Sequence, residues 1–163
     1  APGIRGTVLV TADPAAAELA ARFGARTIVQ RLPGLNAALR EARGIALDHG
    51  ATAVLVLPID LPAISASEIE ALLAEGAAHR PSARPLVLAV PDRHGTGTNA
   101  LLVSPPAAIE PAFGEGSFAA HRSAALKAGA VFVRHEGPLT LDVDTSADLL
   151  AAEAVTSGGR GAA

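Results

Sequence analysis

The sequence contains no cysteine, methionine, tryptophan or tyrosine, and phenylalanine supplies its whole aromatic content of 2%. Without cysteine the chain can form neither disulfides nor thiolate metal sites, and it has no thiol nucleophile. Proteins that bind nucleic acids usually carry a basic face and, for single strands, stacking aromatic side chains. The net charge of −3 and the few aromatics argue against a nucleic-acid partner.

Long hydrophobic runs and targeting signals are also missing. A membrane-spanning helix needs about 20 consecutive apolar residues. The longest apolar runs, at 52–58 and 85–91, have only the length of buried strands. The N-terminus shows no secretory pattern of basic start, apolar stretch and small-residue cleavage site. We therefore expect a cytoplasmic protein without a membrane partner.

The chain does have enough apolar material for one core, because 50% of its 163 residues are hydrophobic and the mean hydropathy is +0.36. We expect a single domain over residues 1–155. The remaining residues, 156–163, are rich in glycine and small side chains, and we expect a flexible tail there.

Short apolar runs alternate with amphipathic segments along the chain. Apolar and β-branched runs predict strands at residues 7–11, 26–30, 52–58, 85–90, 99–103 and 130–134. Helical spacing and capping residues predict helices at 15–23, 35–49, 65–78, 117–128 and 145–155. This alternation indicates an α/β fold with a mainly parallel sheet covered by helices on both faces. Two consecutive strands near residues 85–104 predict an antiparallel excursion, and hence a mixed sheet.

Three acidic residues follow or lie within predicted extended segments. In α/β folds the ligand crevice lies beyond the carboxyl ends of the strands, and Asp60 comes directly after the apolar run 52–58. Asp142 and Asp144 alternate along an extended segment and so face the same side. Such carboxylates suit Mg²⁺, which prefers oxygen ligands. Alternatively, Asp60 stabilises a turn before Pro62, while Asp144 or Thr145 caps the following helix and Asp142 is solvated.

The segment PDRHGTGTNAL, residues 91–101, is a candidate anion site. Its glycines permit close approach of the backbone to a ligand, and the amides and the Thr98 hydroxyl can donate to phosphate or carboxylate oxygens. Arg93 and His94 can add further donors. The alternative interpretation is a glycine-rich turn between two strands.

Two further segments place small residues at helix starts. Gly114 and Ser117 in FGEGSFAAHR form a second candidate anion site, because free N–H groups and the helix dipole favour negative charge there. Gly34 and Asn36 in GLNAAL could hydrogen-bond a base or a ribose. The alternative interpretation, which each segment taken by itself favours, is an ordinary helix start.

Other site patterns are missing. The sequence has no Gly-x-Ser-x-Gly elbow, no Walker A sequence and no G-x-G-x-x-G after a strand, which disfavours hydrolase, P-loop and dinucleotide-binding classes. His49, His79 and His135 have no companions at metal-ligand spacing, and we interpret them as surface residues.

Four segments in this order resemble one known family: VLVLPIDLP, PDRHGTGTNALL, FGEGSFAAHR and LDVDTSADL. The family is that of the 2-phospho-L-lactate or phosphoenolpyruvate guanylyltransferases of coenzyme F420 biosynthesis, and the resemblance spans about residues 7–150. It implies a three-layer GT-A-like nucleotidyltransferase fold, of the nucleotide-diphospho-sugar transferase type. It also implies that GMP moves from GTP to the phosphate of a three-carbon phospho-acid, with release of pyrophosphate.

The resemblance further implies a role for each candidate residue. The residues that would hold Mg²⁺ and support catalysis are Asp60, Asp142 and Asp144. The acceptor phospho-acid would be bound by Thr98, Gly114, Ser117, Arg93 and His94, and the nucleotide by Gly34 and Asn36. The partners would be GTP and a small phospho-acid, and the oligomeric state is left open, a homo-oligomer included.

Two alternatives remain at this point: a nucleotidyltransferase for another acceptor, such as a molybdopterin-type cofactor or a sugar phosphate, and a non-catalytic acceptor-binding module. The family pattern begins with a strand, a Lys-x-Arg-Leu loop that grips the GTP phosphates, and a helix. The present sequence starts just before a segment that resembles the second strand of that pattern. We therefore expect the first strand, loop and helix to be absent from these residues, neighbouring strand edges to be unpaired, and turnover by the 163 residues alone to be low.

Overall fold

The computed structural model describes residues 3–30, 34–79 and 84–141. The strands are β1 (Val8–Thr11), β2 (Arg26–Val29), β3 (Val54–Val56), β4 (Leu86–Pro91), β5 (Thr98–Ser104) and β6 (Val131–Arg134). The helices are α1 (Pro14–Arg22), α2 (Leu35–Asp48), α3 (Ala66–Ala78), α4 (Ser117–Lys127) and the 3₁₀ turn η1 (Pro138–Thr140). All predicted elements within these ranges are confirmed. The predicted helix at 145–155 and tail at 156–163 lie outside the described residues.

Local capping explains where two helices begin. The Asp13 carboxylate accepts a hydrogen bond from the Ala15 N–H at 2.8 Å, and Pro14 occupies the first turn of α1, where its missing N–H costs nothing. Ser65 accepts from the Glu68 N–H at 3.2 Å at the start of α3. Among the described residues, no helix is long and apolar enough to cross a membrane.

The strands form two sheets. β1 and β2 pair in parallel, and a second sheet has the order β3-β5-β4-β6. β5 is antiparallel to both β3 and β4, whereas β4 is parallel to β6. β3, β4 and β6 therefore point the same way and β5 alone is reversed, which confirms the predicted antiparallel excursion.

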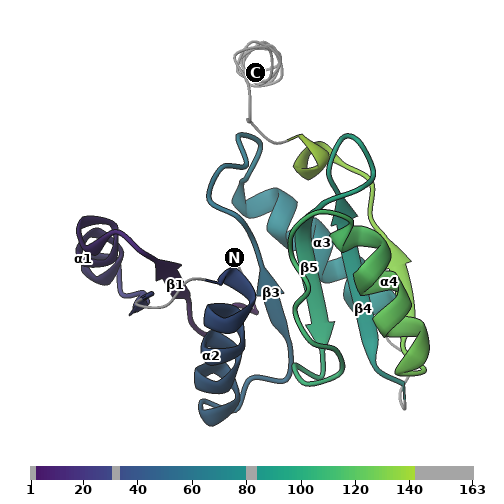
Figure 1. The fold of residues 1–163 in the computed structure, drawn as a ribbon, viewed down its shortest axis with the longest axis horizontal. Coiled ribbons are helices and arrows are strands. Elements are labelled where there is room, and N and C mark those ends of the chain that lie inside the picture. The colour runs from purple at the N-terminus through teal and green to yellow at the C-terminus, as the bar shows by residue number, and fades with distance from the viewer. Residues whose placement is uncertain (1–2, 31–33, 80–83, 142–163) are drawn as a thin grey trace.

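The division into two sheets differs from the single sheet expected from the sequence. Within the described part of the chain, β1 pairs only with β2 and β3 only with β5, so β1 and β3 each keep an unpaired edge. The β1–α1–β2 unit projects from the molecule, and α2 lies between it and the larger sheet (Figure 1). β1 and β2 are joined through one short helix, and their backbones hydrogen-bond to each other. Among the described residues, no strand connects them to β3.

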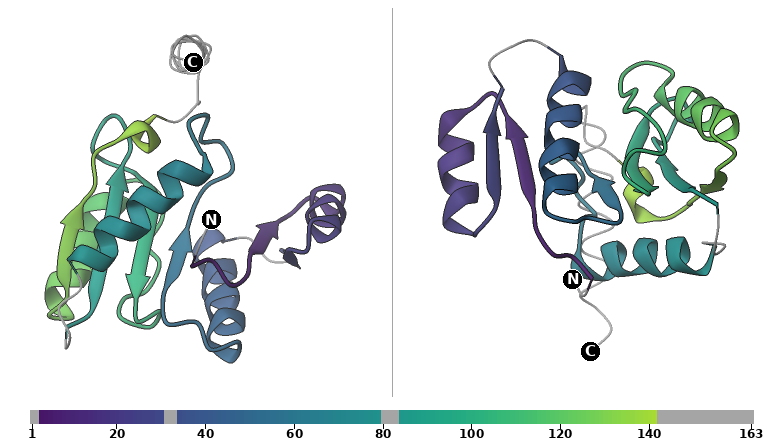
Figure 2. Two further views of the ribbon diagram at one scale, coloured as in Figure 1. Left: turned by 180° about the vertical axis from the view of Figure 1, so that it is seen from behind. Right: turned by 90° about the horizontal axis from the view of Figure 1, so that it is seen from below.

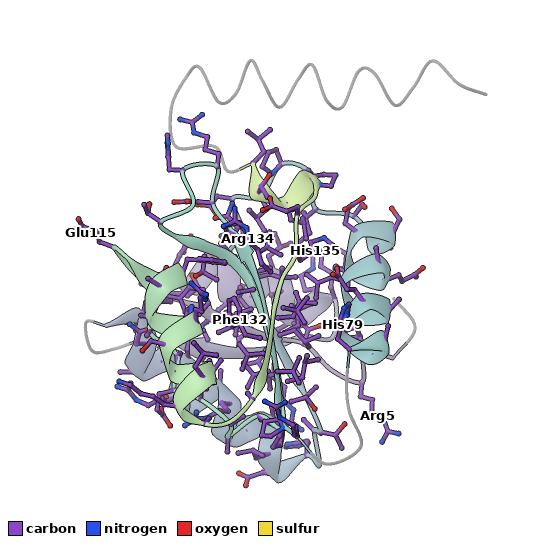
Figure 3. All side chains as sticks on the ribbon, turned by 90° about the vertical axis from the view of Figure 1, so that its right-hand side faces the viewer. Arg5, His79, Glu115, Phe132, Arg134 and His135 are labelled. Atoms are coloured by element: carbon purple, nitrogen blue, oxygen red, sulfur yellow. The ribbon has the colours of Figure 1, made fainter. Side chains whose placement is uncertain are left out.

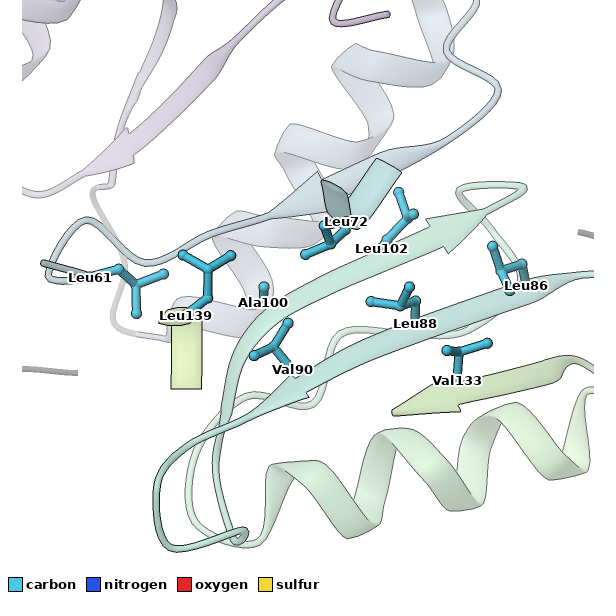
Figure 4. Close-up of a cluster of buried hydrophobic side chains, with 9 residues drawn as sticks. All are labelled: Leu61, Leu72, Leu86, Leu88, Val90, Ala100, Leu102, Val133 and Leu139. Atoms are coloured by element: carbon cyan, nitrogen blue, oxygen red, sulfur yellow. The ribbon is translucent and has the colours of Figure 1, made fainter. Parts of the chain in front are cut away.

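Strands β4 and β5 are buried on both faces, as continuous apolar strands in such folds usually are. Alternate residues of β4 point to opposite faces. Leu86 and Leu88 join a cluster with Leu72 of α3 (Figure 4), whereas Val87 packs in a second cluster with Phe118 of α4. The strands accordingly lie between α3 and α4 (Figure 2), which gives the predicted three layers.

Alanine substitutions at two helical glycines should have opposite effects on stability. A Cβ on Gly76 of α3 would lie 2.5 Å from Cδ2 of the buried Leu102, whereas a Cβ on Gly44 of α2 would meet nothing within 4 Å. Gly76→Ala should lower the free energy of unfolding by about 1 kcal/mol or more through overpacking. Gly44→Ala should raise it by up to about 1 kcal/mol, because alanine favours the helix. Urea unfolding checks both, and equal stabilisation by the two changes would contradict this packing.

Candidate functional site

Three loops meet at one end of the larger sheet, beyond the carboxyl ends of β3, β4 and β6 (Figure 1). Val56 of β3 pairs with Leu101 of the antiparallel β5. Going forward from Val56 leads to Asp60, and going backward from Leu101 leads to Thr98. Asp60, in the loop after β3, and Thr98, at the start of β5, therefore lie at the same end of the sheet, where α/β folds bind ligands.

The loop between β4 and β5 is held in shape by Asp92. Its carboxylate accepts hydrogen bonds from the N–H groups of Gly97 and Thr96, both at 2.8 Å, and from the Thr96 hydroxyl at 3.3 Å. Burial raises the pKa of Asp92, but these bonds and the Gly95 N–H together outweigh it, so that its pKa lies below the ordinary value. A Cβ on Gly97 would lie 2.6 Å from Asp92 Oδ2, so this close approach requires glycine.

The start of α4 lies against this loop. Phe118 donates its N–H to the Thr96 carbonyl at 3.1 Å, and the helix is preceded by Gly116 in the left-handed region, with φ of 69°. Gly114 also has a positive φ and is exposed, whereas Ser117 is buried. The structure thus brings the two predicted anion sites into contact with each other.

His121 of α4 links the same two segments from inside. Its Nδ1 lies 3.1 Å from Thr98 Oγ1, and its Nε2 accepts the Ala112 N–H at 3.0 Å. The imidazole is fully buried and its ring meets that of Phe113 edge-on, with centroids 5.0 Å apart. Burial lowers its pKa to about 4. Sequence reasoning gave His121 no role, although its position one helical turn after Ser117 was an available signal.

Asn36 connects α2 to the glycine loop. Its amide nitrogen donates to the Phe113 carbonyl at 2.9 Å, and its amide oxygen accepts the Phe113 N–H at 2.8 Å. Gly34 caps α2 with φ of 124°. Both residues therefore lie beside the segment that leads to Gly114. Because Asn36 uses its amide to hold this loop, its direct contact with a nucleotide stays a prediction, as does that of Gly34.

The predicted metal ligands are only partly within the described residues. Asp60 is exposed and has no hydrogen-bond or ion-pair partner among them, so its carboxylate is available to a cation. Neighbouring Leu61 packs in the same cluster as Leu139 of η1 (Figure 4), which holds the Asp60 loop near residue 141. Asp142 and Asp144 lie outside the described residues. No group of three or more potential metal ligands occurs in the described ranges, so the Mg²⁺ site stays a prediction.

Arg93 and His94 occupy the exposed part of the hairpin loop. The Arg93 Nε–H donates to His94 Nε2 at 3.1 Å. Contact of Arg93 and His94 with the acceptor phospho-acid stays a prediction. Both residues lie on the loop that Asp92 stabilises, which leads into Thr98 at the start of β5.

The other histidines behave differently from one another. His49 and His79 are exposed at helix ends, which confirms their interpretation as surface residues. That interpretation is wrong for His135, which lies between β6 and α3 (Figure 3) and forms a hydrogen bond through Nδ1 with the Glu75 carboxylate of α3. The partner is 60 positions away in sequence, so local spacing could not indicate it.

A hollow of about 370 Å³ lies elsewhere, lined by residues 4–7 before β1 and by residues around the end of α1. None of the predicted site residues lines it. Its wall is more apolar than polar and carries no cluster of acids or donors. The polar groups of the candidate site lie instead around the β4–β5 hairpin loop and the start of α4.

Comparison with solved structures identifies the fold. A nucleotide-diphospho-sugar transferase structure from Desulfovibrio desulfuricans G20 superposes with a TM-score of 0.66 at 15% identity, covering 96% of this chain and 66% of that one. The structure of CMP:2-keto-3-deoxy-manno-octonic acid synthetase with CTP superposes with a TM-score of 0.56 at 15% identity. It covers 97% of this chain and 83% of that one. The fold is that of the nucleotide-diphospho-sugar transferases, which confirms the predicted fold class.

Sequence comparison identifies the family within this fold. The profile of the family described as Guanylyl transferase CofC like matches residues 3–159. A phosphoenolpyruvate guanylyltransferase of Sphaerobacter thermophilus is 47% identical over 148 residues, 90% of this chain and 68% of that protein. A phosphoenolpyruvate guanylyltransferase of Rubrobacter xylanophilus is 44% identical over 158 residues, which cover 96% of this chain and 74% of that protein. The chain belongs to the CofC-like guanylyl transferase family.

The buried imidazole predicts how stability depends on pH. Because burial lowers the pKa of His121 from 6.5 to about 4, the unfolded chain binds a proton between these values that the folded protein does not. The free energy of unfolding should therefore fall as pH is lowered from 6.5 toward 4. In His121→Asn this dependence should be weaker by up to about 1.4 kcal/mol per pH unit. Urea unfolding at several pH values measures it, and an unchanged slope would contradict a neutral buried His121.

Proposed function

We propose that the protein transfers GMP from GTP to the phosphate of a three-carbon phospho-acid, phosphoenolpyruvate or 2-phospho-L-lactate, in coenzyme F420 biosynthesis. The observation that carries this proposal is membership of the CofC-like family, with 47% identity to a relative named phosphoenolpyruvate guanylyltransferase. Cytoplasmic location is proposed with it. The connected loops at the end of the sheet supply a physical reason why such a substrate would bind there.

The reaction is an exchange of phosphoanhydride bonds. A phosphate oxygen of the acceptor attacks the α-phosphorus of GTP and forms a new P–O bond. The bond between the α-phosphorus and the oxygen that bridges to the β-phosphorus breaks, and pyrophosphate leaves with the electron pair. An acceptor phosphate is already anionic near neutral pH, so no general base is required. Catalysis therefore depends on positioning and on neutralising phosphate charge.

The proposed acceptor site lies where the hairpin loop meets α4. There the N–H groups of residues 114–116 and the hydroxyls of Ser117 and Thr98 can donate to phosphate and carboxylate oxygens, whereas the Ser117 N–H donates to the Gly114 carbonyl. Asp92 and Asn36 would hold the two loops in place before the ligand arrives. Mg²⁺, which Asp60 would hold with Asp142 and Asp144, would supply further neutralisation of phosphate charge.

The proposed activity predicts pyrophosphate release from GTP. The complete gene product, given GTP, Mg²⁺ and either phosphoenolpyruvate or 2-phospho-L-lactate, should release pyrophosphate and form a guanylylated phospho-acid. Coupled detection of pyrophosphate and mass analysis of the product would measure this. No release with phosphoenolpyruvate, 2-phospho-L-lactate or 3-phosphoglycerate would contradict the proposal. Release only with a sugar phosphate or a molybdopterin-type acceptor would favour the alternative nucleotidyltransferase.

The metal assignment predicts a selective effect of Asp60. Asp60→Asn should lower kcat about 100-fold or more, because even indirect disturbance of a metal ligand commonly costs about 10- to 100-fold. Asp48→Asn is the matched control, since Asp48 is also exposed but ends α2 at the opposite end of the molecule. Its activity should remain at the wild-type level. Wild-type kcat and Mg²⁺ dependence in Asp60→Asn would show that this carboxylate does not bind the metal.

A further inference from the structure

His121 makes two specific hydrogen bonds from a fully buried position. It lies one helical turn after Ser117, so both side chains share a face of α4. One ring nitrogen reaches Thr98 at the start of β5, and the other reaches Ala112, two residues before Gly114. The imidazole is therefore connected to each segment of the proposed acceptor site.

The backbone determines which ring nitrogen carries the proton. The Ala112 N–H can only donate, so Nε2 must accept with its lone pair and cannot carry a hydrogen. In the neutral ring Nδ1 then carries the hydrogen. Thr98 Oγ1, at 3.1 Å, is the acceptor of that hydrogen. A protonated ring would set Nε2–H against the Ala112 N–H, and the lowered pKa of His121 agrees with a neutral ring.

This arrangement gives the Thr98 hydroxyl a defined polarity. A hydroxyl has one hydrogen to donate and accepts through its lone pairs. Since Thr98 accepts from Nδ1, its own hydrogen stays available, and the described residues offer it no other hydrogen-bond partner. An oxygen atom of an anionic ligand is the kind of group that this hydrogen can bind.

We propose that His121 is a positioning residue of the acceptor site, which directs the Thr98 hydroxyl as a donor to the anionic acceptor and whose tautomer is fixed by the Ala112 N–H. This inference rests on the proposed function in placing the acceptor at Thr98. A residue that served packing alone would need no polar atoms, and burying them without partners would cost free energy. Here both ring nitrogens have partners, and those partners belong to the two substrate-binding segments.

Two substitutions separate the two hydrogen bonds. Asparagine places an amide nitrogen near the position of Nδ1, so His121→Asn can still donate to Thr98 but leaves Ala112 unpaired. Glutamine reaches the position of Nε2, so His121→Gln can accept from Ala112 but loses the donor to Thr98. In the complete gene product, His121→Gln should raise KM for the acceptor about tenfold, in line with one lost hydrogen bond. His121→Asn should keep it within about twofold, and KM for GTP should change little in either variant.

The Thr98 variants test whether His121 acts through the hydroxyl. Thr98→Val should raise the acceptor KM as His121→Gln does, and Thr98→Ser should restore it. Combining Thr98→Val with His121→Gln should add little beyond either change, because both remove the same interaction. Equal losses in His121→Asn and His121→Gln, or fully additive effects in the double variant, would overturn the proposal.

Two further measurements keep the inference testable by itself. Nitrogen NMR shifts of wild-type His121 should report a neutral ring protonated at Nδ1, and an Nε2–H tautomer would refute the arrangement. If wild-type protein releases no pyrophosphate, the proposed function fails, but calorimetric binding of phosphoenolpyruvate and inorganic phosphate still tests the positioning role. An affinity for these anions about tenfold lower in His121→Gln, with the affinity of His121→Asn near that of wild type, would support the positioning role. Equal affinities in wild type, His121→Asn and His121→Gln would contradict it.

Discussion

Strands β4 and β5 are buried on both faces, and this requirement organises the rest of the larger sheet. Apolar side chains alternate to either side, so each face needs a cover, which α3 and α4 supply. The two strands are joined directly by a short loop, and therefore that loop emerges between the two covering layers. Its contact with the first turn of α4, from Phe118 to Thr96, follows from this geometry. The position of the proposed acceptor site thus follows from how the central hairpin is buried.

The site is held together by hydrogen bonds between side chains and backbone that exist before any ligand binds. Asp92 closes the hairpin loop, Asn36 ties α2 to Phe113, and His121 joins Thr98 to Ala112. Donors that are already oriented lose little by reorganisation when an anion arrives, which is the main source of electrostatic catalysis. For the proposed reaction, which needs positioning and charge neutralisation rather than a base, such an arrangement suits the binding of an anionic acceptor.

Much of this fold could be predicted because its signals are local. β-branched runs, the Asp13 and Ser65 caps and the glycines after helices are all visible within a few residues of sequence. The separation of β1 and β2 from the larger sheet could not be predicted, since pairing depends on which strands come together in space. The same limit applies within the site. The Asn36–Phe113 contact joins residues 77 positions apart, and the hydrogen bond between His135 and Glu75 was missed for the same reason.

Backbone NMR titration tests most directly whether the acceptor binds between the hairpin loop and α4. With phosphoenolpyruvate added, we expect the largest amide shift changes within residues 95–98 and 114–118, because these two segments border the proposed anion site and an added charge changes the shifts of nearby amides. Val29 and other residues of the β1–β2 unit should be nearly unaffected. Saturable changes centred on residues 4–7 and 23–25, around the apolar hollow, with none at the start of α4, would contradict the account.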